Sequence, residues 1–199
     1  MIKLQVFSLL LLYMGSLANL SAEYSNTASL DGNNFKVYWT HNATSNMMYI
    51  ALEVKATGWV TLAFAKEKSS SMKDYDACLG YVSGGTKVLN DYLTKSRNSP
   101  PEDSHNDCML DEAMLNGGTT TIKYHRKVNT GDSQDIVIEK GEIIVVWAYR
   151  NAVTSLSRHD KKGFETLTMI SSGKAAKLKS FYWKITVASL SVVVALFFK

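Results

Sequence analysis

The feature of this chain that most constrains its fold is a series of short apolar segments separated by turn signals. Within these segments apolar residues recur at every second position or run continuously, and no long segment shows the 3.6-residue period of a helix. Turns rich in Gly, Asn and Asp separate them. The pattern predicts eight strands: Phe35–Thr40, Met48–Lys55, Trp59–Ala65, Ala77–Val82, Lys87–Thr94, Thr119–Lys127, Asp135–Ile138 and Ile143–Tyr149. We therefore predict an all-β fold, a single antiparallel immunoglobulin-like β-sandwich over residues 23–170.

The N-terminus has the features of a secretory signal peptide. A basic start at Lys3 precedes a short apolar run at residues 6–13, and the small residues Ser16 and Ala18 follow it. We predict a leader at residues 1–18. Ala22 is a second small residue at which signal peptidase could cleave, so cleavage after residue 22 is the alternative.

The C-terminal residues 171–199 predict attachment to a membrane. An apolar run of 14 residues, 185–198, is shorter than the roughly 20 residues of a spanning helix. A Lys-rich spacer precedes it, an order typical of a glycosylphosphatidylinositol (GPI) signal. The candidate anchor residues are Ser171, Ser172 and Gly173. The alternative is a single-pass tail helix extended by aromatic residues; either one predicts a domain on the extracellular face of the plasma membrane.

Charge argues against a nucleic-acid partner. The full chain carries a net charge of +4, but six of its 22 basic residues lie in the leader or tail, which leaves 16 against 18 acidic residues. The predicted mature domain is slightly acidic and lacks the excess of basic residues that such partners require.

Two covalent modifications are predicted for a chain that enters an oxidising compartment. Cys78 and Cys108 are the only cysteines, and a bridge between them would close a loop of about 31 residues and stabilise the fold by roughly 3–4 kcal/mol. Two free thiols are the alternative. Asn42 begins an Asn-Ala-Thr sequon between two predicted strands, so we predict glycosylation there.

Two strand-to-loop segments carry the chemistry. Gly58–Phe64 is an apolar strand that leads to Met72, and Trp147–Tyr149 is an apolar strand that leads to His159. A thioether and an imidazole are both iron ligands. The two residues lie 87 positions apart, a separation that allows a sandwich to bring them to the same end.

These segments, with Asp74–Asp76 and Gly163 beside the two candidate ligands, resemble the DOMON family of extracellular β-sandwich domains. The matching part runs from Phe35 to Gly163 and is similar to the extracellular domain of ferric-chelate reductases and their short relatives. Haem-binding members hold iron between a Met and a His at these positions. The resemblance therefore implies a haem b with Met72 and His159 as axial ligands, and the adjacent Tyr75 and Arg158 are predicted to contact the haem edge or its propionates.

A haem held by a thioether and an imidazole would transfer single electrons. The resemblance implies a membrane-anchored b-type cytochrome, with ferric reduction requiring a separate membrane cytochrome as partner. The alternative is a non-haem DOMON interaction module that binds a membrane receptor or a small ligand. No Ser/His/Asp order or carboxylate pair stands at a catalytic motif, so no catalytic residue is assigned.

An acidic segment interrupts the strand pattern at residues 96–115. Its carboxylates could bind calcium or ferric ions, but the spacing lacks the alternating ligands and the Gly of a calcium loop, so we predict a solvated acidic loop. His105 lies within the segment and is predicted to face solvent. The acidic residues are Glu102, Asp103, Asp107, Asp111 and Glu112.

Overall fold

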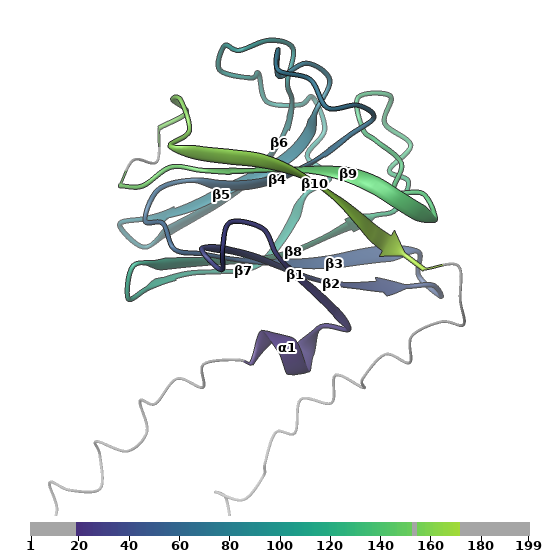
Figure 1. Ribbon diagram of the computed structural model, residues 1–199, viewed down its shortest axis with the longest axis horizontal. Helices are drawn as coiled ribbons and strands as arrows, with labels where there is room; N and C mark the ends of the chain where they lie inside the picture. Colours follow the sequence, from purple (N-terminus) through teal and green to yellow (C-terminus); the bar gives the residue numbers. More distant parts are fainter. Residues whose placement is uncertain (1–18, 153–154, 172–199) are drawn as a thin grey trace, which may run out of the picture.

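Two antiparallel five-stranded sheets face each other in the computed structural model, which describes residues 19–152 and 155–171 (Figure 1). The first sheet has the order β1-β2-β3-β8-β7, and the second has the order β10-β9-β4-β5-β6. The elements are α1 (Leu20–Glu23), β1 (Asn26–Ser29), β2 (Phe35–Asn42), β3 (Met47–Val54), β4 (Val60–Ala65), β5 (Asp76–Ser83), β6 (Thr86–Leu93), β7 (Met109–Asn116), β8 (Thr119–Lys127), β9 (Gly141–Tyr149) and β10 (Lys161–Ile170). The predicted all-β sandwich is confirmed.

The core lies between the sheets and follows from strand periodicity. On β8 every second residue points inward, from Thr120 through Ile122 and Tyr124 to Arg126, and these four are buried while their neighbours are half-exposed. Strand β4 differs, because all six of its residues are buried. One of its faces contributes to the core, so something must also cover its other face.

Three strands were not predicted from the sequence. Strands β1, β7 and β10 lie at the edges of their sheets, and most of their residues are exposed or half-buried. The prediction that residues 96–115 are irregular is wrong from Met109 onward, where β7 begins. The predicted strand Asp135–Ile138 is also wrong, because that segment crosses between β8 and β9 without pairing into a sheet.

The predicted disulfide is confirmed. Cys78 on β5 is bonded to Cys108, whose Cα lies 5.8 Å from that of Cys78 and which directly precedes β7. Because β5 belongs to the second sheet and β7 to the first, the bridge ties the two sheets together.

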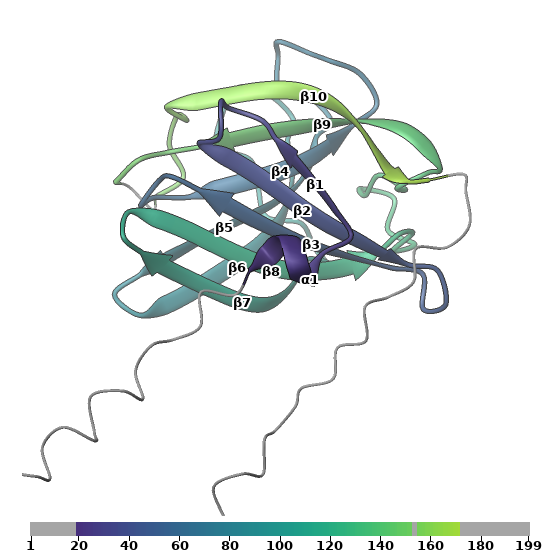
Figure 2. The ribbon, with the colours of Figure 1, turned by 60° about the horizontal axis from the view of Figure 1, so that its bottom comes forward.

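Helix α1 lies against the outer face of the first sheet (Figure 2). Leu20 and Tyr24 pack there on Tyr38 and Ala51 in a small buried cluster. The predicted leader and nearly all of the predicted anchor segment, including Ser172 and Gly173, lie outside the described residues; Ser171 is the last residue described. Within the described ranges, no helix is long and apolar enough to cross a membrane.

Candidate functional site

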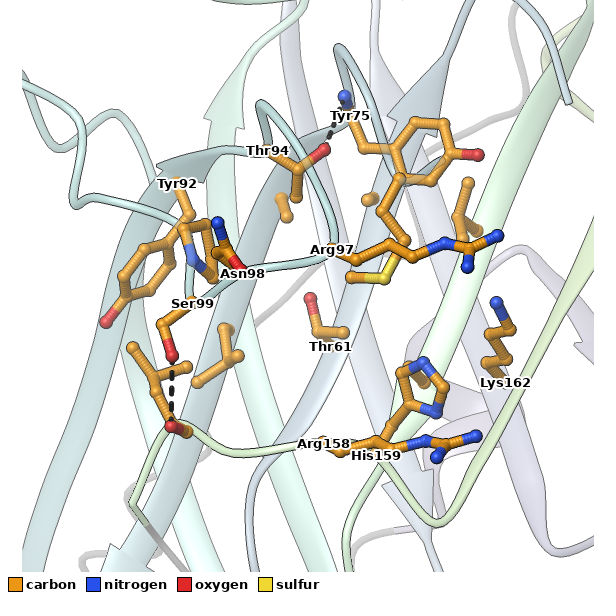
Figure 3. Close-up of a pocket in the computed structure, with 18 of the residues that line it drawn as sticks. Thr61, Tyr75, Tyr92, Thr94, Arg97, Asn98, Ser99, Arg158, His159 and Lys162 are labelled. Atoms are coloured by element: carbon orange, nitrogen blue, oxygen red, sulfur yellow. Dashed lines mark hydrogen bonds between the residues drawn. The ribbon is translucent and has the colours of Figure 1, made fainter. Parts of the chain in front are cut away.

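A cavity of about 630 Å³ lies on the outer face of the second sheet (Figure 3). The residues packed around it bury the outward-facing side chains of β4, so this strand is buried on both sides. Its floor consists of small or apolar side chains on adjacent strands, so the sheet surface is open to a flat ligand. The floor residues are Thr61 and Ala63 on β4, Ala77 and Leu79 on β5, and Val146 and Ala148 on β9.

Three loops form the walls of the cavity and are hydrogen-bonded to one another. The loop between β4 and β5 is held by Arg97 of the loop after β6, whose Nε donates to the carbonyl of Ser70 at 3.1 Å. The loop after β6 is in turn bonded to the loop between β9 and β10, where Ser99 Oγ donates to the carbonyl of Leu156 at 3.2 Å (Figure 3). The walls are therefore a connected unit supported by the rigid sheet.

Met72 lines this cavity from the loop between β4 and β5. It is half-buried and its φ is +57°, and Asp74 two residues later has a φ of +58°. Residues other than glycine adopt this left-handed conformation at a cost and do so mainly where the surroundings impose it. Here the backbone N–H of Asp74 donates to the carbonyl of Thr94 at 2.7 Å, which fixes the end of the loop.

Tyr75 presents its ring to the cavity while its hydroxyl is used elsewhere. The hydroxyl donates to the carbonyl of Ser69 and accepts from the backbone N–H of the same residue at 2.9 Å. The ring packs edge-on against Phe164 with centroids 5.9 Å apart, and the backbone N–H donates to Thr94 Oγ1 at 2.9 Å (Figure 3). Tyr75 therefore offers the cavity an aromatic surface.

His159 lines the cavity from the loop between β9 and β10. The loop is fixed at the next residue, because the N–H of Asp160 donates to the carbonyl of Tyr149 at 3.0 Å and Asp160 Oδ2 accepts from the N–H of Asn151 at 2.7 Å. Burial lowers the pKa of His159, and the charge of Lys162 lowers it further. Both effects favour the neutral imidazole, whose lone pair can bind a metal.

Three cations lie at one side of the cavity. In the view of Figure 3 the charged ends of Arg97, Arg158 and Lys162 extend toward the same side, near His159. They come from two loops and from β10. An apolar floor beside a group of cations fits a flat apolar ligand that carries anionic groups at one edge.

Among the described residues that line the cavity, one buried side-chain polar atom has no hydrogen-bond partner. Trp59, which precedes β4, is 5% exposed, and its Nε1 has no hydrogen-bond partner among the described residues. Buried indole N–H groups usually have an acceptor, so this donor is consistent with a ligand that supplies one.

All four of the site residues predicted from sequence, Met72, Tyr75, Arg158 and His159, line the same cavity. Arg97 and Lys162 were not predicted, because their proximity to the site arises only from pairing of β10 with β9 and from the loop after β6. Gly163, noted in the sequence as part of the family resemblance, has a packing role. It pairs with Trp147 on the neighbouring strand, and a Cβ at position 163 would overlap the indole ring.

The acidic residues of the segment 96–115 do not line the cavity, although residues 97–100 at its start do. Asp111 and Glu112 belong to β7, where they pair with His125 at 2.8 Å and with Lys123 at 3.0 Å, so the predicted solvated loop ends before them. His105 is exposed as predicted and bonds Asp132 at 3.0 Å in a separate shallow depression.

Asn42 lies at the end of β2 in the turn to β3. Its side-chain oxygen accepts a hydrogen bond from the backbone N–H of Thr44 at 3.0 Å. The turn position is compatible with an attached glycan, and glycosylation of Asn42 stays a prediction.

Comparisons with known proteins identify the family. DBH-like monooxygenase protein 1 from Mus musculus is 29% identical over 143 residues, which are 69% of this chain and 23% of that protein. The chain thus spans less than a quarter of the length of the curated relatives that it matches.

Solved structures share the fold. The cytochrome b domain of pyranose dehydrogenase from Coprinopsis cinerea aligns with a TM-score of 0.57 at 14% identity, over 72% of this chain and 80% of that one. The cytochrome domain of Myriococcum thermophilum cellobiose dehydrogenase aligns with a TM-score of 0.56 at 14% identity, over 72% and 81%. The DOMON domain model matches residues 31–150. The chain belongs to the DOMON domain family.

Proposed function

We propose that this DOMON domain binds a b-type haem in the cavity and carries single electrons, with Met72 and His159 as the axial ligands. The observation that supports this most is that a thioether and an imidazole, 87 residues apart in sequence, line one cavity with an apolar floor. Structural neighbours that are cytochrome domains by name add support at the level of fold.

The lining residues fit the chemistry of this group. The small side chains on β4, β5 and β9 leave room for a planar macrocycle above the sheet, and the ring of Tyr75 borders it. Arg97, Arg158 and Lys162 would pair with the two propionates, and Trp59 Nε1 would find an acceptor. When bound, haem with a thioether and an imidazole cycles between ferric and ferrous iron at a raised potential.

The loops would act by holding the two ligands in place. Met72 is held in a strained backbone conformation by the bonds of Asp74 and Tyr75 to Thr94, and His159 is held by the bonds of Asp160. Ligands that are fixed in advance limit rearrangement when the charge of the iron changes, which favours rapid electron transfer.

Ferric reduction at the cell surface is the cellular role that we propose for such a carrier. It would require a separate membrane cytochrome as electron donor and an anchor, either GPI or a tail helix, in residues 171–199. Release of the protein from cells by a phosphatidylinositol-specific phospholipase distinguishes the two anchors.

A second candidate is an interaction module that binds a receptor or another small ligand. The cavity supports this candidate because an apolar floor beside three cations also fits other flat ligands that carry carboxylates. Haem titration separates the two, because a folded protein that fails to bind haem supports the interaction module.

The test is haem titration of the purified domain followed by absorption spectroscopy. Replacement of His159 by Ala removes the stronger donor and is expected to weaken haem affinity at least 100-fold, whereas Met72→Ala is expected to leave binding within about tenfold but to lower the reduction potential. The matched controls are His105→Ala and Met109→Ala, which remove an exposed histidine and a 52%-exposed methionine outside the cavity. Equal effects of control and cavity variants would contradict the assignment.

A further inference from the structure

A second polar site lies between the sheets, separate from the lining of the cavity. Asp76 on β5, Asp91 on β6 and Asp135 in the β8–β9 connection bring their carboxylates together, with oxygen atoms within 4.8 Å of one another. Arg126 on β8 is fully buried beside them. The side chains of Asp76 and Asp135 are 0% and 4% exposed, and Asp91 is 2% exposed.

Arg126 neutralises only part of this charge. Its Nη1 donates to both oxygens of Asp76 at 3.0 and 2.8 Å, and its Nη2 donates to Asp135 at 3.1 Å. Three carboxylates beside one guanidinium leave two negative charges unbalanced when all are ionised. Buried charge without a counter-charge is strongly unfavourable, so the cluster must take up protons or a cation.

Two oxygen atoms in this region lack partners. Asp91 Oδ2 accepts from the backbone N–H of Asp107 at 3.3 Å, but Asp91 Oδ1 has no hydrogen-bond partner among residues 19–152 and 155–171. The same is true of the hydroxyl of Tyr124, which is fully buried and lies near enough to Asp76 and Asp91 for their charges to raise its pKa, after burial as the main cause. An ionised carboxylate oxygen can only accept, so Asp91 Oδ1 indicates a missing donor or cation, whereas the Tyr124 hydroxyl could also be short of an acceptor.

We propose that Asp76, Asp91 and Asp135 bind one divalent cation, which we assign as calcium. The charge of a divalent ion would balance the two negative charges that Arg126 leaves. Calcium binds oxygen ligands at 2.3–2.6 Å, so ligand atoms up to about 5 Å apart can share one ion, as the 4.8 Å limit of this cluster allows.

The chemistry of the cluster favours calcium over other divalent ions. All of the ligand atoms offered are oxygens, which disfavours zinc, and Cys78 nearby on β5 is held in the disulfide. The cluster is buried, whereas magnesium usually keeps several waters. The pKa values of two of the acids agree with a shortage of positive charge. Burial, followed by the negative charge of Asp76, raises the pKa of Asp91 to about 7 and the pKa of Asp135 to about 6.

The test is calorimetric titration of the EDTA-treated, haem-free domain with calcium chloride at pH 7.5, paired with thermal unfolding. The wild-type domain should bind one calcium, and at about 100-fold excess over the dissociation constant its Tm should rise by roughly 5–10 °C. Asp91→Asn keeps an oxygen that can accept from Asp107 but removes one charge, so it should lose at least tenfold in affinity while folding normally in EDTA.

A matched control locates the ion. Asp103, His105 and Asp132 form a more exposed group that could also hold a metal, so Asp132→Asn should leave calcium binding unchanged. Calcium binding that is lost in Asp132→Asn, or kept in Asp91→Asn, overturns the assignment. A wild-type domain with no heat of binding and no Tm shift at millimolar calcium also overturns it, and protons then balance the cluster.

Discussion

The cavity and the carboxylate cluster are opposite exceptions to the rule that a sandwich is apolar inside and polar outside. The cavity places small apolar residues on the outer face of the second sheet, and the cluster places three carboxylates and a guanidinium between the sheets. Strand β5 contributes to both, through Ala77 outward and Asp76 inward. Each exception is costly without a ligand or counter-charge, so the two regions are where binding is expected.

The outer face of the first sheet is covered by residues of the chain itself. Leu20 and Tyr24 cover Ala51 there, and Lys123 pairs with Glu23 at 2.9 Å, so apolar and charged groups are satisfied by the chain itself. Ala63 on the second sheet is also buried, but the loops around it leave a cavity.

Removal of the guanidinium from the cluster should have the largest effect. Arg126→Met keeps much of the side-chain volume over Phe64, whose ring centroid lies 5.6 Å from the guanidinium carbon, but leaves three carboxylates without a counter-charge. We expect a loss of about 3–5 kcal/mol in the free energy of unfolding, measured by urea denaturation at pH 7.5.

Lys36→Met is the control, because Lys36 pairs with Glu53 at 3.2 Å with both side chains about one-third exposed. It should change stability by less than about 1 kcal/mol. Equal losses in the two variants would show that Arg126 is no more important than a surface cation.

The pH dependence of Asp91 tests the same imbalance. Because the pKa of Asp91 is raised to about 7 in the folded state, its contribution to stability is present below its unfolded pKa of about 4 and is lost as pH rises to 7. In EDTA, the stability of the wild type relative to Asp91→Asn should fall by roughly 2–3 kcal/mol between pH 5 and pH 8. A constant difference across this range would mean that Asp91 is ionised at pH 5, and the contrast between cluster and cavity would weaken.

A matched pair of substitutions compares the two outer faces. Ala51→Leu inserts three carbons under Leu20 and Tyr24 and should cost about 1–3 kcal/mol, whereas Ala63→Leu extends into the cavity and should cost less than about 1 kcal/mol. Haem affinity should respond in the opposite way, falling at least tenfold in Ala63→Leu and staying unchanged in Ala51→Leu. Similar stability losses for both would show that the cavity closes in solution.

The smallest effect is expected at the charged side of the cavity. Arg158→Ala removes one exposed cation and should weaken haem binding only about two- to fivefold, with the difference reduced at high salt. Titrations at low and high ionic strength measure this. An unchanged affinity at low salt would place the propionates elsewhere.

Sequence patterns predicted the central strands and the edge strand β6, but not the edge strands β1, β7 and β10. Alternation and apolar runs identified β2, β3, β4, β5, β6, β8 and β9. Strand β7 has a register shift between Leu110 and Glu112 that interrupts the alternation, and β10 exposes mostly polar residues. The predicted strand at Asp135–Ile138 failed because Asp135 turns toward Arg126 and Ile136 donates its N–H to Asp76 instead of to a strand neighbour.

The cavity could be anticipated in part because its two candidate ligands follow strands with recognisable motifs. The carboxylate cluster could not be anticipated, since its three acids are far apart in the chain and the guanidinium that pairs with them, Arg126, lies on β8. One signal was present: Arg126 continues the inward-facing series of Thr120, Ile122 and Tyr124, which predicts a buried charge.

The most direct test of the central claim is the absorption spectrum of the haem-reconstituted domain, oxidised and reduced, with and without carbon monoxide. We predict one haem per domain, a Soret band that sharpens on reduction and no change with carbon monoxide, because the proposed ligands Met72 and His159 would leave no open position on the iron. A folded domain that binds no haem, or a spectrum that shifts with carbon monoxide because one axial position is open, would contradict this account.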